Sequence, residues 1–192
     1  MSTKASLRRQ FRPLRQSLLE AVEAAIVAQA RRHIPALVPA GRALGLYWPL
    51  PGEVDLRGLE TLLPGGLALP AIVPAGAGGD LGARLVFRPW RGGEPLEPDG
   101  CRIPAPLAGA GELPAQALGL LLVPALACDA AGIRLGYGGG WYDRLRADPA
   151  WAQVPAVAVL PRGCRVERLP RDPWDVPLQG WLDEDGLAWL DW

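Results

Sequence analysis

Glycines and aromatic residues lie side by side in one short segment, "RLGYGGGWYDRL", which spans residues 134–145. Glycines let backbone N–H groups approach an anion closely, and aromatic side chains can cover a flat ring. As a phosphate-binding pattern the segment is weak. No Gly-Lys-Ser/Thr follows it, and it does not match Gly-x-Gly-x-x-Gly with an acidic residue about twenty positions later. A tight turn with no ligand is the alternative, so an anion site here needs support from other parts of the chain.

Basic residues near the N-terminus could give that support. Lys4 is the only lysine in the chain, and a compact ammonium group is a common phosphate ligand. A helix would place Lys4 and Arg8 on one face, and Arg12 and Arg15 continue the basic row. Two simpler interpretations stay open, because a row of charges is usually a solvated helix face and a single lysine can reflect codon usage.

Hydrophobic periodicity indicates the elements that would position these groups. It predicts helix over residues 2–33, broken or kinked near Pro13, with a second helix starting at the capping-box sequence that begins at Ser17. A short helix is expected over 56–63. Five apolar runs are typical of strands and cover residues 43–50, 67–73, 84–90, 118–126 and 154–160. The alternation predicts one α/β domain over residues 1–192, a Rossmann-like three-layer arrangement with a mostly parallel central sheet flanked by helices.

The glycine segment follows the strongest apolar run directly, and residues 141–147 then begin a helix. This order would make the glycines a strand-to-helix turn, which is a common phosphate cradle. Glu53 would lie just beyond the carboxyl end of the first strand, where open α/β sheets bind ligands. Alternatively, Glu53 is a carboxylate at a helix N-terminus. A Gly/Ala-rich loop separates the second and third strands, and the tryptophan-rich tail is expected to cap the fold.

Composition excludes several classes of protein. The 192 residues carry a formal net charge of zero, which argues against a nucleic-acid binder or a membrane-surface binder. No apolar run approaches the length of a membrane span. The three cysteines are widely spaced and the chain has one histidine, so neither a disulfide framework nor a zinc site is expected. We expect a cytoplasmic protein, monomeric or homodimeric, that acts on small molecules.

A longer sequence around the glycines, "VPALACDAAGIRLGYGGGWYDRL" (123–145), resembles the signature of the 5-formyltetrahydrofolate cyclo-ligase family, also called methenyltetrahydrofolate synthetases. "KASLR" (4–8) is similar to the opening of that family, "YWPLPGEVD" (47–55) to its glutamate-containing loop, and "LPRDPWDVPL" (169–178) to its C-terminal aspartate segment. The resemblance therefore extends over almost the whole chain, with its parts in the same order.

The resemblance implies a role for each matching residue. The nucleotide site would consist of Lys4, Arg8, Arg134, Leu135, Gly136, Tyr137, Gly138, Gly139, Gly140, Trp141 and Tyr142. The folate would be held by Trp48, Glu53 and Trp141, with Tyr142 and Arg134 acting in catalysis. Asp143 and Asp175 would bind Mg²⁺, which prefers hard carboxylate oxygens and bridges to phosphates.

The implied reaction uses ATP and Mg²⁺ to cyclise 5-formyltetrahydrofolate to 5,10-methenyltetrahydrofolate, through phosphorylation of the formyl oxygen. Four positions depart from the family pattern. Gly139 replaces a common lysine, whose contact Arg144 or Arg146 could supply. Trp141 replaces a tyrosine, Cys128 replaces a phenylalanine as a core change, and Ala105 replaces a glutamate. Two alternatives remain open: a family member that binds nucleotide or folate without turnover, and a different α/β enzyme acting on a phosphorylated or acyl-thioester ligand.

Overall fold

The apolar runs of the sequence come together in one large sheet. The computed structural model describes residues 3–74 and 82–190, and within them seven strands pair in the order β12-β11-β9-β6-β1-β2-β3. These strands are β1 (Ala43–Gly45), β2 (Leu67–Pro74), β3 (Ala83–Trp90), β6 (Leu118–Pro124), β9 (Ala156–Val159), β11 (Gly180–Asp183) and β12 (Gly186–Trp189). Neighbours from β2 to β11 are parallel, whereas β3 and β12 are antiparallel edge strands. The prediction of a mostly parallel sheet is confirmed.

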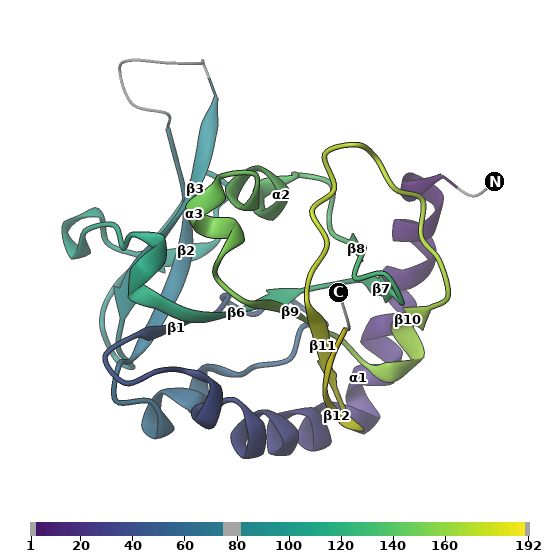
Figure 1. Cartoon of the computed structure of the whole chain (residues 1–192), viewed down its shortest axis with the longest axis horizontal. Helices are drawn as coiled ribbons and strands as arrows, with labels where there is room; N and C mark the ends of the chain where they lie inside the picture. Colours follow the sequence, from purple (N-terminus) through teal and green to yellow (C-terminus); the bar gives the residue numbers. More distant parts are fainter. Residues whose placement is uncertain (1–2, 75–81, 191–192) are drawn as a thin grey trace.

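Helices cover both faces of the sheet (Figure 1). They are α1 (Lys4–His33), α2 (Trp141–Arg146) and α3 (Pro149–Ala152), together with the 3₁₀ helices Pro35–Leu37, Arg57–Leu62, Ala108–Ala110, Ala115–Ala117 and Arg162–Cys164. Side chains alternate between the two faces along the central strand β6. Leu120 and Leu122 pack in the same buried cluster as Ile26 of α1. Leu121 and Val123 belong to the opposite cluster, against which α2 and α3 pack. This is the expected three-layer α/β arrangement.

The prediction of a helix break at Pro13 was wrong, because α1 runs without interruption from Lys4 to His33. Proline lacks the N–H that would bond to the carbonyl of Arg9, at a cost of about 3 kcal/mol in a helix interior. Both Arg9 and Pro13 are exposed, so water can hydrate the freed carbonyl. Burial of an apolar face that includes Phe11 and Leu19 outweighs the rest of the cost, and no second helix starts at Ser17.

Two other predicted elements are shorter or tighter than expected. The run over 43–50 is a strand only from Ala43 to Gly45, after which the chain leaves the sheet toward Pro49 and Pro51. The helix expected over 56–63 is a 3₁₀ helix, Arg57–Leu62. After a last backbone hydrogen bond from Leu46 to Ala68 of β2, at 2.9 Å, the chain is free of sheet pairing, which allows the following side chains to reach beyond the carboxyl end of the strand.

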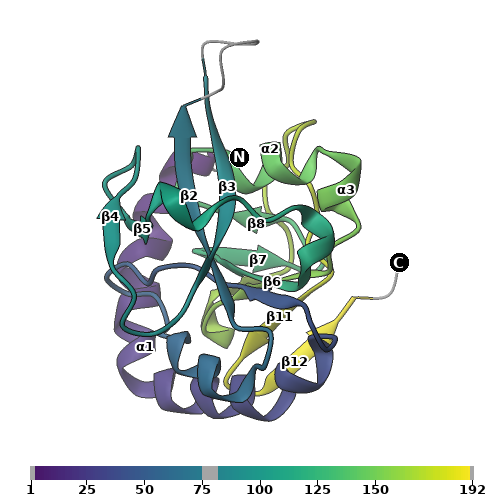
Figure 2. The ribbon, with the colours of Figure 1, turned by 90° about the vertical axis from the view of Figure 1, so that its left-hand side faces the viewer.

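Tryptophans of the tail extend the sheet instead of capping it. Trp181 lies in β11 and Trp189 in β12, a pair of strands that the sequence patterns did not reveal. Trp174 is 68% exposed, and Trp192 lies outside the described residues. In Figure 2, β2 and β3 extend together beyond the body of the molecule, and most of the Gly/Ala-rich loop between them also lies outside the described residues.

Small strands carry the chain from the sheet to the glycine segment. β7 (Ala127–Asp129) pairs with β8 (Arg134–Leu135) and with β10 (Arg165–Val166), so a hairpin separates β6 from the glycines. Asp129 is buried at its turn, and its carboxylate accepts hydrogen bonds from the amides of Ile133 at 2.9 Å and Leu169 at 2.9 Å. The hairpin and the C-terminal segment are thereby held together. A separate hairpin pairs β4 (Leu96–Pro98) with β5 (Pro104–Pro106).

Gly132, in the turn of the β7–β8 hairpin, is a position where only glycine fits. Its φ is +75°, and a Cβ there would lie 2.1 Å from the carbonyl oxygen of Leu178. We expect Gly132→Ala to reduce the free energy of unfolding by about 3 kcal/mol or more, because left-handed strain and the backbone clash add. Thermal unfolding should show a Tm lower by about 6–12 °C. Gly58→Ala is the matched control, because a Cβ at Gly58 meets nothing within 4 Å. Equal Tm values for the two variants would contradict the prediction.

Within the described ranges, no helix is long and apolar enough to cross a membrane.

Candidate active site

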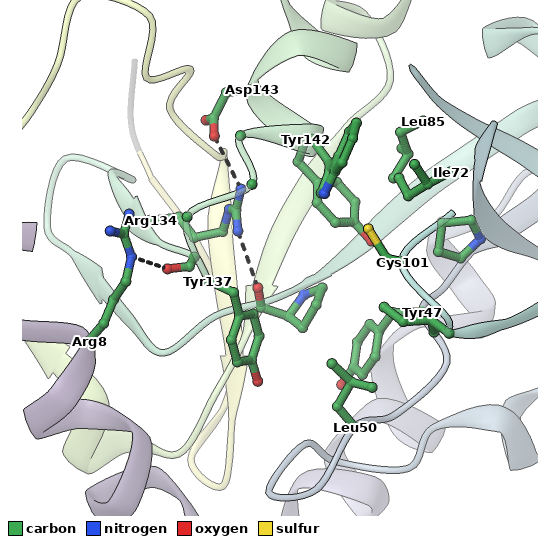
Figure 3. A pocket seen from close by; sticks show the side chains of 18 of the residues that line it. Arg8, Tyr47, Leu50, Ile72, Leu85, Cys101, Arg134, Tyr137, Tyr142 and Asp143 are labelled. Atoms are coloured by element: carbon green, nitrogen blue, oxygen red, sulfur yellow. Dashed lines mark hydrogen bonds and ion pairs between the residues drawn. The ribbon is translucent and has the colours of Figure 1, made fainter. Parts of the chain in front are cut away.

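A cavity of about 580 Å³ opens beyond the carboxyl ends of β1 and β6, where Tyr47 and Pro124 line it. Segments that are distant in sequence line it: the start of α1, the chain after β1, the β2–β3 pair, the loop 99–103, the glycine segment and residues 172–175. Figure 3 shows Arg8 and Arg134 on one side of this space, with Tyr47, Leu50, Ile72 and Leu85 on another. One wall is therefore basic and the other is apolar and aromatic.

Nearly all of the residues singled out from the sequence line this cavity. They are Lys4, Arg8, Trp48, Glu53, Arg134, Gly136, Tyr137, Gly138, Gly139, Gly140, Trp141, Tyr142, Asp143 and Asp175. Leu135 is the exception, because its side chain is buried in the core between β8 and the sheet. The structure thus brings together the N-terminal basic pair, the glutamate loop, the glycine segment and the C-terminal aspartate.

The glycine loop, residues 136–140, carries open backbone into the cavity. Gly138 has a φ of +105° and Gly140 a φ of +63°, values that other residues rarely adopt. The Nε of Arg8 donates a hydrogen bond of 2.8 Å to the carbonyl of Gly136 (Figure 3), which fixes the loop against α1. Because α2 has only six residues, the exposed loop amides and the nearby cations, more than a helix dipole, make this wall suitable for phosphates.

Arg134 lies at the centre of the polar wall. Its guanidinium is 3.4 Å from the Asp143 carboxylate and donates to the carbonyl of Pro124 at 3.5 Å (Figure 3). It also lies 5.3 Å from the centre of the Tyr142 ring. The Tyr142 hydroxyl is buried and has no hydrogen-bond partner among the described residues. Burial raises the pKa of Tyr142 well above its usual value, against the opposing charge of Arg134. Tyr142 therefore keeps a neutral, unpartnered hydroxyl beside the cavity.

Glu53 is almost completely buried, with 2% of its side chain exposed. Its carboxylate accepts hydrogen bonds from the amide of Leu50 at 2.9 Å and the hydroxyl of Tyr137 at 2.8 Å. Burial raises the pKa of Glu53, and these two bonds together with Arg15 oppose the rise. The carboxylate of Glu53 contacts Leu50, Tyr137 and Arg15 of α1, and not the start of the 3₁₀ helix at Arg57. The alternative of a carboxylate at a helix N-terminus therefore has no support here. A buried carboxylate with unused lone pairs suits a ligand that donates hydrogen bonds.

Lys4 and Asp175 neutralise each other at the cavity mouth. The ammonium of Lys4 donates to the carboxylates of Asp172, at 2.8 Å, and Asp175. Burial lowers the pKa of Lys4, but its bonds to the two aspartates outweigh this and leave the pKa raised. Asp143 lies nearby, because its carboxylate accepts from the amide of Val176 at 3.4 Å.

Asp143 and Asp175, the two predicted metal ligands, suit an ion that is held jointly by the protein and a bound phosphate better than an ion held by protein side chains alone. Among the described residues, no group of three or more His, Cys, Asp or Glu side chains is placed to hold a metal. Mg²⁺ commonly binds one or two carboxylates and takes its other ligands from substrate phosphates and water. Asp143 and Asp175, beside a wall suited to phosphates, fit that pattern.

The departures from the family pattern have different structural consequences. Ala105 lies in β5, buried against Ala71 and outside the cavity. Arg146 is buried and donates to the carbonyl of Val154 at 2.9 Å, so it cannot replace a lysine at position 139. Arg144 stacks on the Trp141 indole at 4.5 Å from its centre and lies beside the glycine loop, because a Cβ on Gly140 would be 3.0 Å from its guanidinium.

Sequence patterns missed several residues of the cavity wall. Asp172 and Trp174 lie in the matched C-terminal segment but were not selected, and Tyr47 immediately precedes Trp48. The apolar wall and the loop at 99–103 carried no motif. Asp99 shapes that loop, because its carboxylate accepts from the amides of Cys101 at 2.8 Å and Ile72 at 2.9 Å. Such long-range contacts leave no local signal in the sequence.

Cys101 gives a simple chemical test of the cavity. It is exposed and lines the cavity, whereas Cys128 and Cys164 are buried. Burial of part of the side chain and the nearby Asp99 raise the pKa of the Cys101 thiol. Cys101 should therefore react slowly, and it should be the only cysteine that reacts. In the folded protein we expect one thiol per chain to react with an aromatic disulfide reagent, and none in Cys101→Ser. A ligand that fills the cavity should slow the reaction at least about tenfold, in proportion to the occupied fraction. Fast reaction of all three thiols would contradict the burial.

Comparisons with known proteins agree with this geometry. The sequence profile of the 5-formyltetrahydrofolate cyclo-ligase family matches residues 1–182. The 5-formyltetrahydrofolate cyclo-ligase of Mycolicibacterium smegmatis is 33% identical over 184 residues, covering 92% of this chain and 91% of that protein. The protein of that name from Escherichia coli K12 is 31% identical over 148 residues, covering 75% and 78%.

Solved structures show the same fold. The 5,10-methenyltetrahydrofolate synthetase of Aquifex aeolicus superposes with a TM-score of 0.70 at 25% identity, covering 97% of this chain and 92% of that one. The synthetase of Mycoplasma pneumoniae gives a TM-score of 0.68 at 18% identity, covering 95% and 99%. With its sequence matched along nearly its whole length and its fold shared, the chain belongs to the 5-formyltetrahydrofolate cyclo-ligase family.

Proposed function

We propose that the protein uses ATP, with Mg²⁺, to cyclise 5-formyltetrahydrofolate to 5,10-methenyltetrahydrofolate, releasing ADP and phosphate. The observation that carries this proposal is the pairing of two unlike walls in one cavity. A basic wall of Lys4, Arg8 and Arg134 beside open glycine backbone faces an aromatic wall that contains Trp48 and the buried Glu53. Two substrates of different chemistry can therefore meet there.

The basic wall would bind the ATP phosphates. Amides of the glycine loop would approach the phosphates closely, and Arg134 and Arg8 would offset their charge. Lys4 would exchange its bonds to Asp172 and Asp175 for phosphate oxygens. Asp143 and Asp175 would hold Mg²⁺, which supplies charge neutralisation on the phosphates when bound.

The aromatic wall would bind the folate. Trp48 and Trp141 present flat surfaces for the pterin, and the Glu53 carboxylate would accept hydrogen bonds from the N–H groups of its edge. Tyr142 lies on the boundary between the walls, and its unpartnered neutral hydroxyl would donate to an oxygen of one of the two substrates. The protein would thus hold the formyl oxygen near the terminal phosphate of ATP.

The chemistry then needs positioning more than a covalent intermediate on the protein. A formamide carbonyl is a weak electrophile, and its oxygen leaves poorly. Its oxygen attacks the γ-phosphorus, the bond from phosphorus to the ADP oxygen breaks, and an iminium phosphate forms. The neighbouring amine nitrogen of the folate attacks the activated carbon, and loss of phosphate and of the amine proton leaves the methenyl ring. Arg134 and Lys4 would stabilise the negative charge of the transferring group.

The direct test is growth of the methenyl absorbance after mixing purified protein, 5-formyltetrahydrofolate and Mg·ATP. The expected result is a signal that requires ATP and grows in step with ADP release. A folded protein that binds ATP by calorimetry but yields no methenyl product would overturn the proposal and favour a binding protein without turnover.

A further inference from the structure

Arg15 is a buried cation directly behind the cavity wall. It lies on α1 two turns after Arg8, yet its side chain is only 3% exposed and it does not line the cavity. A buried charge costs several kcal/mol unless partners compensate it. Its surroundings therefore bear on the site, although the residue itself touches no ligand.

Three segments converge on the Arg15 guanidinium. It donates to the carbonyl of Ala125, after β6, at 3.2 Å, and to the hydroxyl of Tyr137 on the glycine loop. It also lies 3.6 Å from the Glu53 carboxylate. The planar fork of arginine allows these contacts at once, which a lysine ammonium cannot reproduce.

Tyr137 completes a chain of hydrogen bonds from α1 to the cavity. Its hydroxyl accepts from Arg15 and donates to Glu53 at 2.8 Å. The aromatic ring is covered by two cations, Arg12 at 5.3 Å and Arg15 at 5.4 Å from its centre. Only Arg15 of these two also contacts Glu53. One side chain thus connects the carboxylate of the folate wall with the loop of the phosphate wall.

We propose that Arg15 is a positioning residue that orients the Glu53 carboxylate and the glycine loop together for catalysis. The assignment of the two walls to folate and to ATP rests on the proposed function. The coupling between the walls rests on the contacts of Arg15. Loss of Arg15 would release both walls at once, whereas loss of an outer basic residue would leave the chain of hydrogen bonds intact.

The pKa of Glu53 separates the two possible roles of Arg15, because it would not change if Arg15 had a purely structural role. The groups that face it are Arg15 from α1, Tyr137 from the glycine loop, and the more distant Tyr47 and Tyr142. Arg15 is the only cation among them, and it opposes the effect of burial on the carboxyl pKa. Removing it should therefore raise the pKa of Glu53 further, so that a higher pH is needed to ionise the group.

The experiment compares Arg15→Gln, Arg15→Lys and Arg12→Gln. The carboxyl carbon of Glu53 is followed by ¹³C NMR during a pH titration, with its signal assigned from Glu53→Gln. We expect Arg15→Gln to move the midpoint to higher pH by about one unit or more. Arg15→Lys keeps the charge and should return the midpoint close to that of the wild type. Arg12→Gln should leave it unchanged.

Kinetics supply the second readout. Arg15→Gln should raise KM for 5-formyltetrahydrofolate about tenfold or more and move the acidic limb of the kcat/KM profile to higher pH, with Arg12→Gln within about twofold of wild type. An unmoved midpoint in folded Arg15→Gln, or an equal shift in Arg12→Gln, would overturn the proposal. If Arg15→Gln does not fold, Arg15→Lys decides, because it should keep the midpoint and still raise KM. The titration needs no turnover, so an inactive wild type would count only against the proposed function.

Discussion

Asp143→Asn is expected to lower kcat by about 10³-fold, equivalent to roughly 4 kcal/mol of transition-state stabilisation. The substitution keeps the size of the side chain and removes its charge. On the proposed function, two contributions are lost together: the carboxylate that would bind Mg²⁺ and the anionic partner of Arg134, 3.4 Å away. Because a proposed ligand of the ion is lost, the residual reaction should also need more magnesium. Without its partner, the Arg134 guanidinium would be freer to turn away from the ATP phosphates.

Initial rates of methenyl formation measured against MgCl₂ at fixed ATP check this expectation. Asp185→Asn is the matched control, because Asp185 pairs with Arg162 and Arg165 on the surface and lies outside the cavity. It should keep the rate within about twofold of wild type. Wild-type rates at low magnesium in Asp143→Asn would remove Asp143 from the metal site.

Glu53→Gln is expected to lower kcat/KM for 5-formyltetrahydrofolate by about 10²-fold, or roughly 2.7 kcal/mol. On the proposed function, the amide loses the charge that would pair with the pterin N–H groups, and it presents N–H donors of its own. It also leaves Arg15 without its buried counter-charge, so the free energy of unfolding should fall by about 3 kcal/mol. The affinity for Mg·ATP should change little, because the phosphate wall is intact.

Steady-state kinetics with each substrate varied in turn separate these effects. Glu20→Gln, at an exposed position on α1 away from the cavity, is the control and should behave like wild type. If Glu53→Gln raised KM for ATP as much as KM for the folate, Glu53 would not belong specifically to the folate wall.

The residues that line the cavity were more predictable from the sequence than the helices and strands that position them. The spacing of Lys4 and Arg8 and the glycines of residues 136–140 are local features of the sequence, so the sequence could single these residues out, and the structure places them around one cavity. The local patterns alone were weak, and the resemblance to a known family connected them. Pro13 shows where such reading fails. A local rule predicts a break there, whereas packing of residues far apart in sequence keeps α1 intact.

Arg15 shows a second limit. In the sequence it continues a basic row and is typical of a solvated face, but in the fold it is buried against Glu53 and Tyr137. Whether a helical position meets solvent or a carboxylate depends on partners 38 and 122 positions away along the chain. No pattern along α1 alone contains that information. The same reason hid Asp99 and the strands β11 and β12.

Because α1 is unbroken, its length determines where Lys4 and Arg8 lie in the active site. Ile26 and Ala30 anchor its far half in the core with 0% exposure, while Lys4, Arg8 and Arg15 meet the cavity and its back wall from the near half. Each added or deleted residue between them would rotate the near half by about 100° and shift it by about 1.5 Å. Lys4 and Arg8 would then face away from the glycine loop even if every residue type were kept. Evolution and engineering can therefore vary the identity of exposed residues in this stretch freely, but its length is a fixed dimension of the enzyme.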